Sequence, residues 1–158
     1  MKSRKIKKTP PRLNTVFQKY DPPLFFITIN TWQHRAVLDN DDILTAFLEY
    51  GQKNAKDGRV IGKFVIMPDH IHLFARLSQE NRLSDFVRLM KQHLDKTLQR
   101  KGVEKPWWQP GFFDHLMRNS ESYRQKWEYV HNNPVRKNLA GKPESWPYQG
   151  EIVRIDRV

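Results

Sequence analysis

The sequence predicts an α+β domain in which an antiparallel sheet carries two helices on one face. Three observations predict this fold class. Apolar and polar residues alternate along several short segments, which is the period of a half-buried strand. Between these segments lie two longer ones in which apolar residues recur at helical spacing. The chain has 158 residues, a length that suits one domain built on a real core.

The predicted elements follow one another in an order that points to a known topology. In chain order they are a strand at 24–30, a helix from the acidic cap at 39–42 to about 57, strands at 59–67 and 70–77, a helix at 83–101, a strand at 112–118, and a last helix that Ser122 and Gln125 open as a capping box. This is the βαββαβ order of ferredoxin-like domains. The first and third strands are central in that topology, so residues 70–77 should lie in mid-sheet.

Composition divides the chain into three parts and indicates its partner. A basic, Pro-punctuated arm at 1–23 precedes the domain at 24–140, and a tail at 141–158 should dock on that domain. Twenty-eight Lys and Arg against seventeen Asp and Glu give a formal net charge of +11. This excess favours a polyanionic partner, most often nucleic acid. A basic protein whose charge serves solubility is the alternative.

Two absences from the sequence restrict the function classes. The chain has no cysteine, so disulfides and thiolate metal sites are excluded. No apolar run approaches the ~20 residues of a membrane span, and the charged start lacks the apolar stretch of a signal peptide. We therefore expect no membrane partner and a cytoplasmic protein.

The most informative motif is Met67-Pro68-Asp69-His70-Ile71-His72-Leu73. Side chains at i and i+2 of a strand point to the same face. His70 and His72 should therefore present two imidazoles side by side, on the sheet face that the two crossover helices leave open. Two converging imidazoles are a common start to a divalent-metal site. The alternative is two polar residues on a partly solvated sheet face.

The last predicted helix can complete the site. Tyr129 and Asn133 are four residues apart, so they should share one helical face. An amide oxygen from Asn133 beside two imidazoles suits Mg²⁺ or Mn²⁺. The Tyr129 phenol could attack phosphorus and leave again, which divides a strand transfer into two reversible steps. Alternatively, Tyr129 packs with its ring and Asn133 ends the helix before Pro134. Tyr123 is a weaker candidate nucleophile.

Other cationic and aromatic residues are candidates for DNA contact. Phosphate contacts of cations position a strand without reading its sequence, although for any single cation an ordinary solvated charge is the favoured interpretation. The candidate cations are Arg12, Lys63, Arg76, Arg118, Arg124 and Arg136. Trp107, Trp108, Phe112 and Phe113 could stack on unpaired bases. For Phe113 we expect packing in the interior instead.

Three motifs together resemble a known family. The segment at 67–73 resembles the His-hydrophobe-His motif of the single-tyrosine HUH transposases (IS200-like transposases). Tyr129-Val130-His131-Asn132-Asn133-Pro134-Val135-Arg136 resembles the catalytic-helix motif of the REP-associated tyrosine transposases, and the segment at 143–148 resembles the Trp-Pro tail of that branch. The resemblance covers about 12–149. The departure from the branch's pattern is Lys137-Asn138-Leu139, where small residues are expected.

The resemblance implies a mechanism and assigns roles. It implies a ferredoxin-like bacterial protein, associated with the nucleoid, that cuts and rejoins single-stranded DNA near hairpin (REP-like) sequences and acts as a monomer. Tyr129 matches the nucleophile that forms a 5′-phosphotyrosine and releases a 3′-hydroxyl. His70 and His72 match the metal-binding pair, and Asn133 matches the third ligand.

Two further readings stay open on the residues alone. One is a non-catalytic module that binds single-stranded nucleic acid, because this sheet topology also serves RNA-recognition domains. It predicts that metal chelation changes nothing. The other is a hydrolytic nuclease, in which water is the nucleophile and no protein–DNA link forms.

Overall fold

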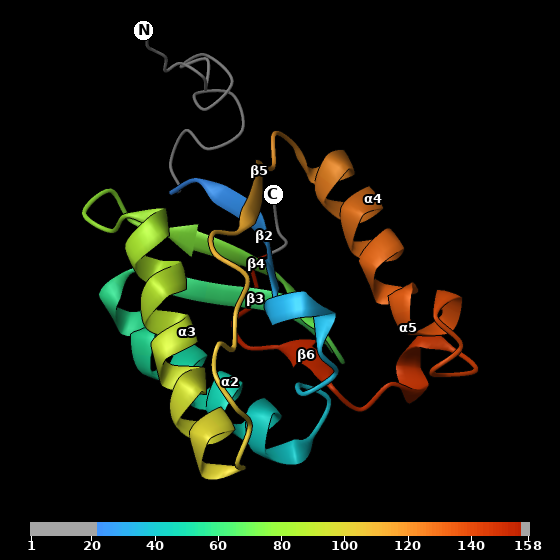
Figure 1. The fold of residues 1–158 in the computed structure, drawn as a ribbon. Coiled ribbons are helices and arrows are strands. Elements are labelled where there is room, and N and C mark those ends of the chain that lie inside the picture. The colour runs from blue at the N-terminus through green and yellow to red at the C-terminus, as the bar shows by residue number, and fades with distance from the viewer. Residues whose placement is uncertain (1–21, 156–158) are drawn as a thin grey trace, which may run out of the picture.

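A five-stranded antiparallel sheet forms the centre of the molecule (Figure 1). The computed structural model describes residues 22–155, so Arg12 and nearly all of the predicted basic arm lie outside the described residues. The strand order is β5-β2-β4-β3-β6. The strands are β2 (Leu24–Asn30), β3 (Arg59–Met67), β4 (His70–Leu77), β5 (Phe113–Leu116) and β6 (Gln149–Glu151).

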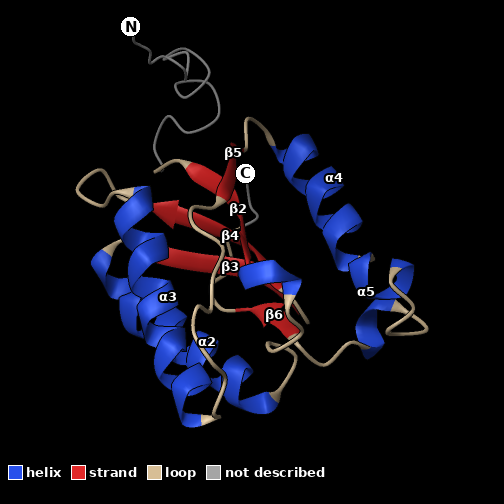
Figure 2. Ribbon diagram, in the orientation of Figure 1, coloured by secondary structure: helices blue, strands red, loops and turns tan. Residues whose placement is uncertain are grey.

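The helices form a layer on each side of this sheet (Figure 2). Helices α2 (Asp41–Asn54) and α3 (Leu83–Arg100) lie together over one face, whereas α4 (Ser120–His131) and α5 (Asn133–Arg136) lie on the other side. Because β2 and β4 are the central strands of the βαββαβ part, the predicted ferredoxin-like α+β fold is confirmed. The additional edge strand, β6, comes from the C-terminal segment and pairs with β3.

The larger core fills the space between the sheet and the helices α2 and α3. Strand β4 contributes Ile71, Leu73, Ala75 and Leu77, which are all buried in this core. Their period of two places every second side chain on the helix-covered face. The same alternation directs His70 and the other intervening residues of β4 to the opposite face.

A second, smaller core lies on the histidine face, beneath α4 and the C-terminal segment. Phe26 and Phe74 of the sheet meet Tyr123 and Val130 of α4 there. Trp146 is also buried in this core, and its indole Nε1 donates a hydrogen bond of 2.9 Å to the carbonyl of Ile66. The face that the crossover helices leave open is thus partly closed by α4, and this packing fixes where α4 ends relative to β4.

The two ends of α4 differ from the prediction. Asn119, rather than Ser122, is the N-cap: its Oδ1 accepts from the Ser122 amide at 2.8 Å, while the Gln125 side chain contacts Glu121. At the other end the helix stops at His131, and α5 begins after Asn132. Proline has no amide hydrogen to donate to the preceding turn. The chain therefore breaks near Pro134, and Tyr129 and Asn133 lie on successive helices rather than on one.

Candidate active site

The two histidines lie side by side at the start of β4, opposite strand β2. His70 is paired with Asn30 and His72 with Thr28. The centroids of the two imidazole rings are 4.6 Å apart, and the rings meet edge to face at 76°. The predicted convergence of the two imidazoles on one sheet face is therefore present in the structure.

Each imidazole is held through its Nδ1 nitrogen. Nδ1 of His70 lies 2.7 Å from Oδ1 of Asp69, and Nδ1 of His72 lies 2.8 Å from Oγ1 of Thr28. A carboxylate can only accept, so Asp69 favours the tautomer in which Nδ1 of His70 carries the hydrogen. Because Nδ1 is engaged in both rings, Nε2 is the nitrogen through which each imidazole could ligate a metal ion.

Burial keeps both imidazoles neutral at neutral pH. Burial lowers the pKa of His72 to about 3, and the charges of protonated His70, of Lys126 and of Arg136 contribute to this shift. The pKa of His70 is lowered as well, because the loss of hydration outweighs the opposing effect of Asp69. Neutral imidazole is the form that can donate a lone pair to a metal ion.

Asn133 is the predicted third group, and the structure brings it to the histidines. Its side chain is buried, with 8% of the residue exposed. Nδ2 of Asn133 lies 3.3 Å from Nε2 of His70, and Oδ1 accepts a hydrogen bond of 3.0 Å from Arg136. The amide therefore lies between an imidazole and a guanidinium.

Tyr129 lies at the outer edge of this cluster. The residue is 63% exposed, and its ring packs against the guanidinium of Arg136, 3.8 Å from the ring centroid. Arg136 thus connects Tyr129 to Asn133, which in turn contacts His70. The phenol is thus exposed at the surface and lies beside a cation.

Two of the predicted cations have structural contacts. Arg76 is buried, and its guanidinium donates to the carbonyl of Pro22 at 2.8 Å. Lys63 extends from β3 toward α4, where its ammonium lies 5.3 Å from the centroid of the Trp127 ring and 5.7 Å from that of Tyr123. These contacts tie the sheet to its neighbouring segments.

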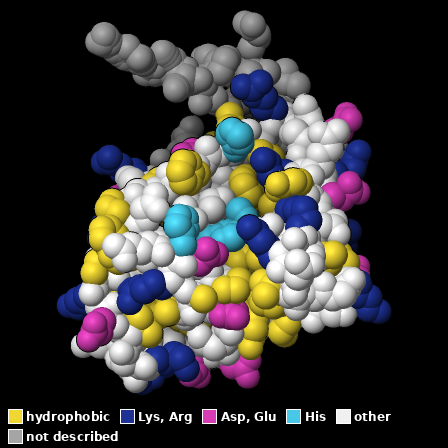
Figure 3. All heavy atoms as spheres, turned by 45° about the vertical axis from the view of Figure 1, so that its right-hand side comes forward, with side chains coloured by type: hydrophobic (Ala, Val, Ile, Leu, Met, Phe, Trp, Pro, Cys, Tyr) yellow, Lys and Arg dark blue, Asp and Glu magenta, His cyan; other side chains and the backbone are white. Residues whose placement is uncertain are grey.

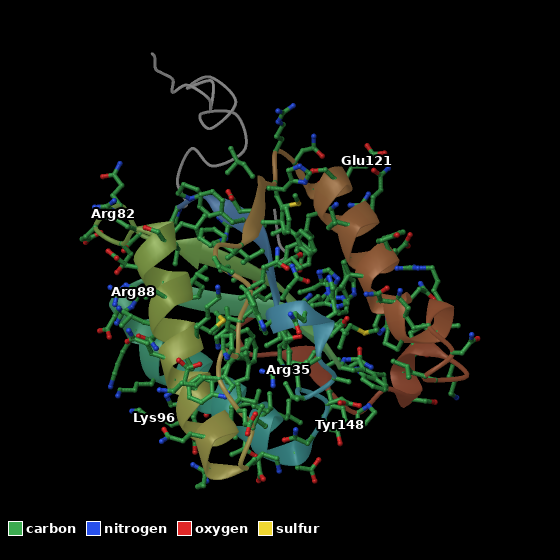
Figure 4. All side chains as sticks on the ribbon, in the orientation of Figure 1. Arg35, Arg82, Arg88, Lys96, Glu121 and Tyr148 are labelled. Atoms are coloured by element: carbon green, nitrogen blue, oxygen red, sulfur yellow. The ribbon has the colours of Figure 1, made fainter. Side chains whose placement is uncertain are left out.

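Two other predicted cations, Arg118 and Arg124, lie exposed near the start of α4. By contrast, Arg88 and Lys96 extend from α3 on the side of the molecule away from α4 (Figure 4). The exposed cations of α4 and α5 are therefore on the same side of the sheet as the histidines, and those of α3 are not.

Sequence reasoning missed two residues of this region and misplaced a third. Asp69 orients His70, and its position next to the histidine could have suggested that role. Thr28 could have been found only from the pairing register of β2 and β4. Phe113 was expected in the interior, but it is 64% exposed on β5, which is one of the two edge strands.

A pocket of about 230 Å³ lies beside His70. Asp69, Lys137 and Leu139 are among the residues that line it, and His34 contributes an imidazole whose Nδ1 is 3.7 Å from Oδ2 of Asp69. Figure 3 shows histidine side chains on this face, with lysine, arginine and hydrophobic side chains beside them. The histidine cluster is thus accessible from the surface.

The chain matches the family model described as "Transposase IS200 like" over residues 26–133, which is well over half of its length. The chain belongs to this family. The matched region contains both histidines, Tyr129 and Asn133. No helix within residues 22–155 is both long and apolar enough to cross a membrane.

Among known proteins, the chain is 28% identical over 89 residues to the REP-associated tyrosine transposase of Escherichia coli K12, covering 56% of this chain and 52% of the relative. It is 27% identical over 94 residues to a putative REP-associated tyrosine transposase of Haemophilus influenzae, covering 52% and 53%. The chain therefore spans about half the length of the curated relatives it matches.

Two solved structures share the fold. One is described as the structure of the REP-associated tyrosine transposase bound to a REP hairpin; it has a TM-score of 0.68 at 21% identity and covers 85% of this chain and 90% of that one. The other is a putative transposase from Deinococcus radiodurans, with a TM-score of 0.50 at 17% identity, covering 80% and 97%.

Proposed function

We propose that this protein binds single-stranded or hairpin DNA and cuts and rejoins it through a covalent bond to Tyr129. Membership of the transposase family supports DNA as the substrate, as do the hairpin bound to a structural neighbour and the net charge of +11. The observation that carries the proposal is the position of Asn133, which is buried against Nε2 of His70. Asn133 is the first residue of α5, and the start of that helix thus brings an amide to the histidine pair.

The residues present fit a divalent cation such as Mg²⁺ or Mn²⁺. Within residues 22–155, no three His, Asp or Glu side chains are placed to hold a metal ion, so an amide oxygen is the natural complement to the two imidazoles. His70 and His72 would each ligate through Nε2. Asn133 would ligate through Oδ1 after its amide turns over, because Nδ2 faces His70 and Oδ1 accepts from Arg136 in this structure. When bound, such a cation polarises the scissile phosphate and leaves positions open for its oxygens.

Tyr129 supplies the nucleophile in this proposal. Its phenol oxygen forms a bond to phosphorus as the bond from phosphorus to the 3′-oxygen breaks; the phenol proton is lost to solvent, and the leaving oxygen takes up a proton as a 3′-hydroxyl. A 5′-phosphotyrosine results. A 3′-hydroxyl that attacks the same phosphorus reverses these bond changes, which rejoins the strand and restores the phenol.

The cations near the site bind the DNA backbone in this proposal. Lys63, Arg124 and Arg136 belong to elements that border the histidine face, and Arg118 lies between β5 and α4. Such cations position a strand by its phosphates. Arg12 of the N-terminal arm would add a further contact. Since Asn133 reaches His70 of its own chain, a monomer can assemble the site.

The decisive experiment is incubation of the protein with an end-labelled single-stranded hairpin and Mn²⁺, followed by a denaturing gel and mass spectrometry. We expect a protein–DNA adduct on Tyr129 that EDTA prevents. A Tyr129→Phe variant should bind the hairpin but form no adduct. Tyr123→Phe, at the buried tyrosine of the same helix, is the matched control and should retain the adduct.

Other outcomes would support different functions. Cleavage that leaves a free 5′-phosphate and no adduct would indicate a hydrolytic nuclease. Binding without any cleavage, unchanged by EDTA, would indicate a binding module. Full adduct formation by Tyr129→Phe would exclude Tyr129 as the nucleophile.

A further inference from the structure

Phe113 is an exposed aromatic residue in line with the histidine pair. It is 64% exposed on the edge strand β5. Phe113 is paired with Thr28 of β2, and Thr28 is paired with His72 of β4. Residues that are directly opposite in neighbouring strands point to the same face, so Phe113 lies on the histidine face. Two strand spacings of about 4.8 Å place its backbone about 10 Å from that of His72.

Ring-bearing residues on neighbouring strands lie between this edge and the site. His115, also exposed on β5, is paired with Phe26 of β2. The ring of Phe26 stacks on His72, with 5.3 Å between centroids and an angle of 22°. The ammonium of Lys126, from α4, lies 5.1 Å from the centroid of Phe26. A positive charge thus lies above the path from β5 to the imidazoles.

The charge of β5 favours a nucleic-acid strand on this face rather than on the other. Asp114 lies between Phe113 and His115, so the alternation of a strand directs its carboxylate to the opposite face. The histidine face of the edge therefore presents two rings and no acid from β5. Aromatic rings beside backbone-binding cations are the recurring composition of single-strand binding sites, because every base has a π-face.

We infer that Phe113, with His115 beside it, forms a stacking site for an unpaired base of the DNA strand, within a few nucleotides of the phosphate held at His70 and His72. This inference rests on the proposed function for the position of that phosphate. The occupant is a single-stranded segment rather than the duplex stem of a hairpin, since only an unpaired base offers a free face to a ring.

The test is a binding measurement that needs no cleavage. Affinity for a single-stranded hairpin is measured in the Tyr129→Phe background, with EDTA present, for Phe113→Leu and Phe113→Tyr. Leucine keeps the apolar bulk and loses the ring, whereas tyrosine keeps the ring. We expect Phe113→Leu to weaken binding by about 5- to 150-fold, the range for one stacked base, and Phe113→Tyr to bind within about twofold.

Three further readouts separate stacking from other causes of weaker binding. The salt dependence of binding should be the same with and without the ring, because stacking releases no counterions. In an abasic scan, the unpaired bases of the hairpin are removed one at a time. Removal of one of these bases should weaken binding when Phe113 is present and should have little effect on binding by the Phe113→Leu variant. Since Phe113 is exposed, thermal unfolding should coincide with that of the parent and show that the fold is intact.

The inference would be overturned if Phe113→Leu bound the hairpin as tightly as the parent. It would also be overturned if Phe113→Leu bound more weakly than the parent on every abasic hairpin, because no single base would then account for the effect of the ring. Failure of the proposed chemistry is distinguishable from this failure. If no adduct forms on Tyr129 yet one abasic position couples to Phe113, the stacking site stands and the transesterase does not.

Discussion

The guanidinium of Arg136 lies 3.8 Å from the centroid of the Tyr129 ring, and the same side chain donates a hydrogen bond to Asn133. One cation thus holds both the proposed nucleophile and the proposed third ligand. A cation–π contact at an exposed site contributes only about 0.5–1 kcal/mol. A phosphate can displace such a contact, since charge-assisted hydrogen bonds to an anion are stronger. In the proposed complex with DNA, Arg136 would therefore exchange the ring for a backbone phosphate.

Replacement of Arg136 should affect the chemical step more than DNA binding. For Arg136→Gln we expect the single-turnover rate of adduct formation to fall about 10- to 100-fold, the equivalent of one lost charge-assisted hydrogen bond, while hairpin affinity falls less. Arg136→Lys should keep the positive charge, but a single ammonium cannot contact both the Tyr129 ring and Asn133 as the planar guanidinium does. Lys137→Gln, which removes the neighbouring cation, is the control. Equal losses in Lys137→Gln and Arg136→Gln would show that net charge alone matters.

Asp69 should determine how tightly the histidine pair binds a metal ion. Its carboxylate accepts from Nδ1 of His70 at 2.7 Å and so orients the ring and raises the basicity of Nε2. Loss of such a partner commonly weakens metal affinity about 10- to 100-fold. We expect Asp69→Asn to weaken Mn²⁺ binding by that factor, measured by calorimetry on the free protein.

His34 provides the control for Asp69. Its Nδ1 is 3.7 Å from the second oxygen of the same carboxylate, beyond hydrogen-bond distance. His34→Gln should therefore leave Mn²⁺ affinity nearly unchanged. An affinity that is unaltered in Asp69→Asn would contradict the role of Asp69.

The C-terminal segment should contribute to stability through Trp146. Its indole Nε1 donates to the buried carbonyl of Ile66 in β3. In Trp146→Phe the ring is smaller and this carbonyl loses its donor, which typically costs about 1–3 kcal/mol. We expect the free energy of unfolding, measured by urea denaturation, to fall by that amount. Pro147→Ala, at the exposed neighbour, should change it much less.

Strand alternation was sufficient to predict the histidine face, because a period of two leaves no choice once Ile71 and Leu73 are buried. The arrangement at the end of α4 was not predictable in the same way. The spacing of Tyr129 and Asn133 indicated one helical face, but the helix breaks at Asn132, and tertiary packing of α4 decides where Asn133 lies.

The contacts that depend on the sheet were also beyond local patterns. The partners of the imidazoles depend on the register of β2 against β4, which the sequence around Thr28 does not reveal. Phe113 was assigned to the interior by residue type alone, whereas its exposure follows from the edge position of β5.

The neutral state of His72 makes the stability of the free protein depend on pH. Its pKa falls from 6.5 to about 3 on folding, chiefly through burial. Between these values the unfolded chain binds a proton that the folded chain does not, so stability is full above pH 6.5 and falls as the pH drops toward 3. With EDTA present, urea denaturation from pH 7.5 to 5 should show a decline that approaches about 1 kcal/mol per pH unit.

The contribution of His72 to that decline can be isolated by substitution. His72→Gln keeps a polar group opposite Thr28 but cannot titrate. Its free energy of unfolding should therefore fall less between pH 7.5 and 5 than that of the parent, by the contribution of one histidine. Parallel curves for the parent and His72→Gln would mean that His72 takes up its proton equally in the folded and unfolded chains, contrary to its burial beside Phe26 and Thr28.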